Sequence, residues 1–176
     1  MLSQNLQDAL NEQIKNEFYS AHVYLAMSSW FEDKGLPGFA KWMRVQYSEE
    51  LTHGLKIFDF INDRDGRALV LGFDAPPTDW KSPLDVFQDS YTHEQKVTAM
   101  INNLYAMAQQ EPDYATLVLM QWFISEQVEE EKNAKLIVDQ LKMSGDSGSA
   151  LLILDRDLGG RKGGGGGETS GGSNPS

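Results

Sequence analysis

The chain has 176 residues, of which 40% are hydrophobic, so it can bury one good core and is most simply a single domain. It contains no cysteine, which excludes disulfides, thiolate-zinc sites, iron-sulfur centres and thiol nucleophiles. Its net charge of -11 argues against nucleic-acid and anionic-membrane partners and favours the attraction of cations. Any bound metal must therefore be held by Asp, Glu, His or Gln.

The sequence also bears on location. No apolar run reaches the roughly 18 residues that a membrane span requires, and the N-terminus lacks a basic and hydrophobic leader. We therefore expect no membrane partner and a cytoplasmic protein, or an organellar one if a transit peptide has been removed.

The first half of the chain predicts two long helices. Core-type residues recur at the 3.6-residue spacing of a helix over residues 3–34, and a second stripe of the same kind runs over residues 39–65. Polar residues interrupt both stripes. Glu17 lies in the first, and Glu50 and His53 lie in the second.

The segment that follows, residues 66–82, contains a double proline and no helical period. About 17 residues at roughly 3.3 Å each can run the length of a helix of about 28 residues at roughly 1.5 Å each. We therefore expect a long crossover between the second and third helices, which then run parallel. Ser82-Pro83 should open the third helix, as N-cap and first helical position.

The third and fourth helices are predicted on either side of the short turn 110–113, so the fourth returns antiparallel to the third. Each again carries polar residues at the centre of an apolar stripe. Glu94 interrupts the stripe of the third helix, and Gln127 and Glu130 interrupt that of the fourth.

A short apolar helix is predicted over residues 148–158. The four long stripes already face a common core, so this helix has no evident partner within the chain, and an exposed apolar patch of that kind marks an interface. Residues 159–176 are rich in glycine and have nothing to bury, so we expect a disordered tail there. The folded domain is accordingly expected to span residues 1–158.

The pattern that indicates function is the pair Glu50 and His53. Residues three apart project from one face of a helix, and a carboxylate with an imidazole inside an apolar stripe suits a first-row metal such as iron. Glu17, Glu94 and Glu130 lie near the middle of the other three helices, where antiparallel neighbours meet at the same level. We therefore predict that the four carboxylates converge in an all-α four-helix bundle.

A carboxylate cluster of this kind needs compensation. Burying unpaired anions costs several kcal/mol apiece, and the core stripes offer no Lys or Arg. Two divalent ions would balance the four charges, with Glu50 placed to bridge them and His53 on one ion only. The competing interpretation rotates one or two of these carboxylates onto the surface, which is the commoner arrangement for any single Glu.

The chain resembles the non-haem ferritins of the bacterial type from its start to about residue 158. The segments that carry this resemblance stand in the family's order and at its separations, and they are Asn16-Glu17-Phe18-Tyr19, Glu49-Glu50-Leu51-Thr52-His53, His93-Glu94 and Glu126-Gln127-Val128-Glu129-Glu130. The resemblance implies a ferritin-like four-helix bundle with a long crossover and a short fifth helix. It also implies a homo-oligomer, a hollow shell of 24 subunits.

The resemblance further implies which residues bind iron. The ligands of a first iron would be Glu17, Glu50 and His53. Those of a second iron would be Glu50, Glu94 and Glu130, with Gln127 behind them. A third iron position beside this pair would use Glu49, Glu126, Glu129 and Glu130. Tyr24 matches a tyrosine that can donate an electron near the irons, although a core tyrosine with a bonded hydroxyl needs only packing.

Three departures from related patterns limit what is carried over. The fourth helix has Gln127 and Glu130 where bacterioferritins repeat the Glu-x-x-His pair, so the second iron should be held more loosely. Leu51 stands where their haem-ligating Met would be, so haem is not expected. Leu117 and Met120 occupy the places where animal ferritins have channel acids, which leaves the route of iron entry open.

The function that the resemblance implies is iron storage and detoxification. A ferroxidase would oxidise Fe(II) with O2 or peroxide at the di-iron site, and the shell would store Fe(III) as mineral. One alternative is a di-iron peroxidase of the rubrerythrin type, which is disfavoured because such proteins carry a Cys-ligated iron domain. A metal-free helical bundle that acts through protein contacts is the other, and it leaves the four central Glu unexplained.

Overall fold

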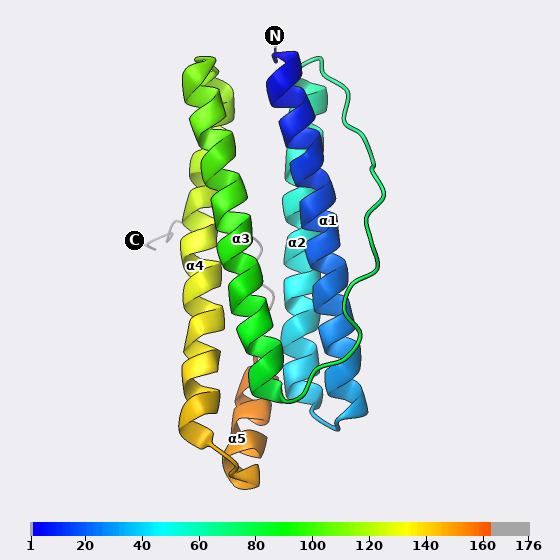
Figure 1. The fold of residues 1–176 in the computed structure, drawn as a ribbon, viewed down its shortest axis with the longest axis vertical. Coiled ribbons are helices and arrows are strands. Elements are labelled where there is room, and N and C mark those ends of the chain that lie inside the picture. The colour runs from blue at the N-terminus through cyan, green and yellow to red at the C-terminus, as the bar shows by residue number, and fades with distance from the viewer. Residues whose placement is uncertain (1, 163–176) are drawn as a thin grey trace, which may run out of the picture.

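The computed structural model describes residues 2–162, and residue 1 and residues 163–176 lie outside the described range. This range contains helices and no strand. The helices are α1 (Gln4–Asp33), α2 (Pro37–Asp63), α3 (Pro83–Gln110), α4 (Tyr114–Ser144) and α5 (Gly148–Leu158) (Figure 1). The all-α bundle expected from the sequence is thereby confirmed, with α5 beginning and ending at the predicted residues.

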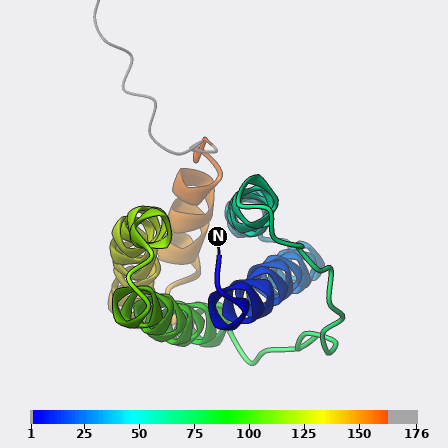
Figure 2. The same cartoon turned by 90° about the horizontal axis from the view of Figure 1, so that it is seen from above.

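The long helices form two antiparallel hairpins, α1 with α2 and α3 with α4 (Figure 1). The hairpins meet chiefly where α1 lies beside α3, and Figure 2 shows α2 and α4 standing apart on the other side. No Cα atom of α2 lies within 8 Å of a Cα atom of α4 over the described residues. We call this side of the bundle the α2–α4 seam.

The crossover between α2 and α3 runs the length of the bundle beside α1, as the sequence predicts (Figure 1). Near its start, Asn11 of α1 donates a hydrogen bond to the carbonyl of Arg67 at 3.1 Å and accepts one from the N–H of Leu69 at 2.7 Å. Near its end, the indole of Trp30 donates to Asp79 at 3.0 Å. These contacts at both ends fix an extended segment that has no regular structure of its own.

Local capping explains where most helices begin. The N-cap side chains of α1, α3, α4 and α5 each accept a hydrogen bond from a backbone N–H in the first turn, and these residues are Ser3, Ser82, Asp113 and Ser147. The N-cap of α2 is Leu36, which offers no such oxygen. Its first turn needs an acceptor from elsewhere.

Asp155 of α5 supplies that acceptor. Its buried carboxylate accepts a hydrogen bond from the N–H of Phe39 at 2.9 Å, and its charge lies at the positive end of the α2 dipole. The approach requires glycine at position 38, because a Cβ there would lie 1.7 Å from the carbonyl oxygen of Asp155. α5 is therefore fitted against the start of α2.

The expectation that α5 has no partner within the chain is thus wrong in part. One side of the helix packs against the core through Leu151, Leu154 and Leu158. The other side is open in the single chain, where Leu152 is 62% exposed and Ile153 is 54% exposed. An amphipathic helix can use both sides, one inside the subunit and one toward another copy.

The core consists of two apolar clusters at different levels of the bundle. One contains Tyr24, Phe31, Phe39, Phe87 and Ile137 among its members, and the other contains Leu10, Ile14, Ile57, Ile101 and Phe123. Buried polar side chains lie between them. None of the helices in residues 2–162 is long and apolar enough to cross a membrane.

Candidate metal centre

The polar layer between the two apolar clusters receives a side chain from every long helix. α1 contributes Glu17, α2 contributes Glu50 and His53, α3 contributes Glu94, and α4 contributes Glu130. All five are buried, and none exceeds 6% exposure. The interpretation that one or two of these carboxylates lie on the surface is therefore wrong.

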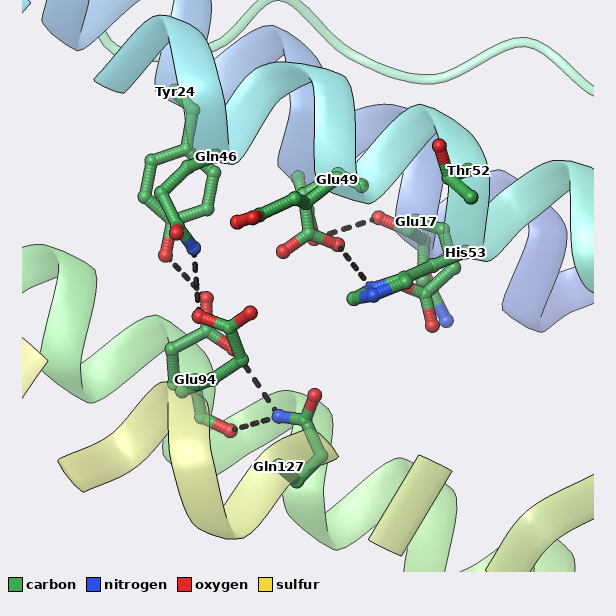
Figure 3. Close-up of polar contacts among 12 residues, drawn as sticks. Glu17, Tyr24, Gln46, Glu49, Thr52, His53, Glu94 and Gln127 are labelled. Carbon is green, nitrogen blue, oxygen red and sulfur yellow. Dashed lines mark hydrogen bonds and ion pairs between the residues drawn. The ribbon is translucent and has the colours of Figure 1, made fainter. Parts of the chain in front are cut away.

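Three of these residues form a compact group. One potential ligand atom from each of Glu17, Glu50 and His53 lies within 4.8 Å of the others. The Nδ1 atom of His53 is 3.4 Å from Oε2 of Glu50 and 4.0 Å from Oε2 of Glu17. The ring of His53 is flanked by the rings of Trp122 and Phe123, at centroid distances of 5.5 and 5.8 Å. The imidazole therefore faces the two carboxylates from a fixed position (Figure 3).

The oxygens that face this imidazole lack ordinary partners. Oε2 of Glu17 and Oε2 of Glu50 are buried and have no hydrogen-bond donor among the residues described. Buried polar atoms without partners are rare in folded proteins and need an explanation. A proton shared by the two carboxyl groups or a bound cation would satisfy both oxygens, and the other Glu17 oxygen already accepts from Gln13 at 2.7 Å.

Burial shifts the proton affinity of the whole layer. It raises the pKa of Glu17 and of Glu50 well above 4.5, and the charge of a facing carboxylate, Glu50 for Glu17 and Glu94 for Glu50, adds to the effect. Burial also raises the pKa of Glu94, and it raises that of Glu130 to about 7. The cluster therefore retains protons at pH values where exposed carboxyls are ionised, and cation binding must release them.

The second half of the layer is held by hydrogen bonds. Tyr24 donates to Glu94, and its hydroxyl also lies 3.1 Å from the hydroxyl of Ser90. Gln127 donates to the other oxygen of Glu94 at 3.1 Å (Figure 3). Gln46 donates to Glu130 at 2.8 Å. Burial raises the pKa of Tyr24 well above 10, so this phenol keeps its proton.

The predicted ligands thus fall into two sets. The structure gathers Glu17, Glu50 and His53 tightly, whereas Glu94 and Glu130 lie outside that compact group in the described chain. Their oxygens are engaged by amide and phenol donors, as given above. Gln127, expected behind the second iron, contacts Glu94 directly.

The residues predicted for a third iron are not gathered into a compact group within residues 2–162. Glu130 is buried, Glu49 and Glu126 are half-buried, and Glu129 is exposed. Oε2 of Glu49 accepts a hydrogen bond at 2.7 Å from the guanidinium of Arg161. Arg161 belongs to the segment 159–176, which the sequence predicts to be disordered. The first residues of that segment are instead placed against α2. The rest of it, residues 163–176, lies outside the described range.

Several residues of the layer were missed in the sequence. Gln13, Gln46 and Ser90 each lie four residues before one of the glutamates, on the same helical face. A polar residue at that spacing inside an apolar stripe is a signal that could have found them. Arg161 gives no such signal, because its neighbour Glu49 is 112 residues away in the chain.

Comparison with known proteins gives consistent matches. The family described as a ferritin-like domain matches residues 7–144. The bacterial non-heme ferritin of Staphylococcus saprophyticus is 42% identical over 161 residues, which cover 92% of this chain and 96% of that protein. That of Staphylococcus aureus is 41% identical over 161 residues, or 92% and 97% of the two chains.

Solved structures agree with the sequence matches. An open pore ferritin from the archaeon Archaeoglobus fulgidus is 47% identical and superposes with a TM-score of 0.91, over 92% of this chain and 100% of that one. The resemblance stated from the sequence and the ferritin-like architecture are thereby confirmed. The chain belongs to the ferritin family.

Proposed function

We propose that the protein stores iron by oxidising Fe(II) at a di-iron centre in each subunit and depositing Fe(III) as mineral inside a hollow shell. One observation carries the proposal. Two buried carboxylate oxygens, on Glu17 and Glu50, face the imidazole of His53 without a hydrogen-bond donor in the described chain. Carboxylate and imidazole are a ligand set that iron accepts, and relatives over most of the chain are non-heme ferritins.

In this proposal the first Fe(II) binds Glu17, Glu50 and His53. The second binds Glu50, Glu94 and Glu130 from the other side, so Glu50 is shared. Gln46 and Gln127 orient the carboxylates of Glu130 and Glu94 through their amide donors. The second set makes more hydrogen bonds to the protein than the first, and we expect it to bind its ion more weakly.

The chemistry balances with the oxidants available to such a site. Two Fe(II) ions each lose one electron, and O2 takes up both electrons with two protons to give H2O2. With H2O2 as oxidant, the same two electrons and two protons give two water molecules. Adjacent irons allow both electrons to reach one oxidant molecule. The carboxyl groups release protons when the irons bind, because burial has raised their pKa values.

Tyr24 is proposed as an auxiliary electron donor when O2 is reduced fully to two water molecules. That reduction takes four electrons and four protons, and the two irons supply two of the electrons, while the phenol and one further Fe(II) would supply the other two. Its hydroxyl donates to Glu94, a ligand of the second iron in this proposal, and is fully buried. Oxidation of a phenol requires that its proton be accepted, and Glu94 is the acceptor already in contact. Loss of this hydrogen bond would by itself free the Glu94 carboxylate, so altered kinetics in Tyr24→Phe would not separate the two roles. A tyrosyl radical detected by electron paramagnetic resonance during oxidation in the wild type, and absent in Tyr24→Phe, would show electron donation.

The proposed shell contains 24 copies of the chain and lies in the cytoplasm. The single chain exposes apolar side chains on α4 and α5 that a larger assembly could bury. These include Tyr114 (77% exposed), Val118 (67%) and Leu152 (62%). Such side chains, on two different helices, suit a subunit that contacts more than one neighbour.

Stopped-flow absorbance after Fe(II) is mixed with apo-protein in air tests the proposal. Glu50→Ala and His53→Ala should abolish the rapid phase, since each removes a ligand of the compact group, while native mass stays that of the wild type. Glu32→Ala, at an exposed position of α1, is the matched control and should react normally. Wild-type initial rates in the first two variants would refute the di-iron assignment.

A further inference from the structure

Arg161 links the segment after α5 to Glu49, the neighbour of Glu50 in the metal centre. It lies three residues beyond α5, and its Nη2 atom donates to Oε2 of Glu49 at 2.7 Å. Its Cζ atom lies 4.6 Å from the centroid of the Trp42 ring, in a cation–π contact. The two charged side chains are only 20% and 16% exposed, so solvent screens the pair weakly.

This contact stands at the α2–α4 seam. A groove of about 480 Å³ is lined there by Trp42 of α2, Ile137 of α4 and Leu154 of α5, with Arg161 forming part of its wall. The Nη1 atom of Arg161 is buried and has no hydrogen-bond partner in residues 2–162. The guanidinium is thus held by one ion pair and one aromatic ring, and one of its nitrogen donors is unpaired. Because so few contacts hold it, another cation can displace the guanidinium from Glu49.

The charge of Glu49 matters for its neighbours. Burial is the main cause of the raised pKa values of Glu50 and Glu130, and the negative charge of Glu49 adds a smaller effect in the same direction. A cation beside Glu49 offsets this effect. In the structure that cation is Arg161, and a bound metal ion would serve the same electrostatic purpose.

We propose that Arg161 is the intramolecular counter-ion of Glu49 and that a cation beyond the first two binds at Glu49 only by displacing the guanidinium. This rests on the proposed function and on the third iron position that the family resemblance implies, for which Glu49 would be a ligand. Arg161 is then a positioning residue that sets the order of filling. The site of Glu17, Glu50 and His53 fills first, because no positive side chain competes there in the described chain.

Calorimetric titration of the assembled apo-protein with Zn(II) alone tests this, because Zn(II) binds carboxylate and imidazole ligands without being oxidised. Glu49→Gln identifies the relevant ion as the one it removes. Arg161→Gln should raise the affinity for that ion about tenfold, which corresponds to about 1.4 kcal/mol, and should leave the affinities for the first two ions unchanged. Arg156→Gln removes the same charge from an exposed residue of α5 and should match the wild type.

Arg161→Lys adds a readout that a merely structural role would not move. Lysine keeps the charge but lacks the planar group that stacks on Trp42. The affinity of Arg161→Lys for the third ion should therefore fall between the affinities of the wild type and of Arg161→Gln. Equal or weaker third-ion binding in Arg161→Gln, or a binding isotherm unaffected by Glu49→Gln, would overturn the proposal. If the wild-type protein failed to bind the first two Zn(II) ions, the proposed function would be overturned instead, so the two failures are distinguishable.

Discussion

Glu130→Gln should stabilise the metal-free protein, and the gain should grow with pH. The substitution keeps the shape of a buried side chain and removes its charge. Burial raises the pKa of Glu130 from 4.5 to about 7. The carboxylate therefore costs the folded state about 3 kcal/mol once it is ionised in both states. The amide must find an acceptor of its own, so we expect a net gain of about 2 kcal/mol at pH 8.

The sign of the pH dependence follows from the direction of the shift. Below about pH 4.5 the group is protonated in the folded and the unfolded chain, so the two proteins should differ little. As pH rises toward about 7, the unfolded chain loses the proton while the folded one retains it, and wild-type stability falls. Glutamine does not titrate and escapes this loss.

Thermal unfolding of apo-protein in chelator, at pH 5 and pH 8 and at one protein concentration, measures the effect. At pH 8 the variant should melt about 4–8 °C above the wild type, and at pH 5 the gap should shrink. Glu129→Gln removes the same charge at an exposed position one residue earlier and serves as the control. The buried-charge reasoning would be refuted if Glu130→Gln melted below the wild type at pH 8. It would also be refuted if the difference in melting temperature were the same at pH 5 and pH 8.

Two further predictions concern α5 and its contacts. Gly38→Ala should lower the stability by about 1–3 kcal/mol in calorimetry, since its Cβ would lie 1.7 Å from a carbonyl oxygen of Asp155, whereas Gly148→Ala adds a Cβ in open space and should melt normally. Equal melting of both variants would show that α5 moves aside without cost. The native mass should be that of 24 subunits and survive deletion of 163–176, while a chain that ends at Ser147 should assemble poorly. A wild-type particle of twelve or fewer subunits would contradict this assembly.

The helices could be predicted because their signals are local. Apolar spacing, Ser82-Pro83 and the short turn at 110–113 act within a few residues of each boundary. The same periodicity placed Glu17 and Glu50 at the centre of their stripes, and both are buried as expected. A buried carboxylate on an amphipathic helix is therefore readable from sequence alone.

Contacts between distant segments could not be predicted in this way. Gln46 lies one turn before Glu50, yet its amide donates to Glu130 on another helix. Arg161 follows a glycine pair in a segment whose composition indicates disorder, and its pairing with Glu49 depends on where α5 ends in space. Helical periodicity gives the face on which a residue lies but not the partner that it meets there.

The cap that Asp155 provides for α2 has a consequence for synthesis. The acceptor for the N–H of Phe39 is encoded 116 residues later, while α2 has no capping side chain of its own at Leu36 in the described chain. Because a nascent chain emerges from its N-terminus, the α1–α2 hairpin can form early but keeps an open end until residue 155 has been synthesised. Chains that terminate before residue 155 would retain that defect, which distinguishes them from chains that include α5.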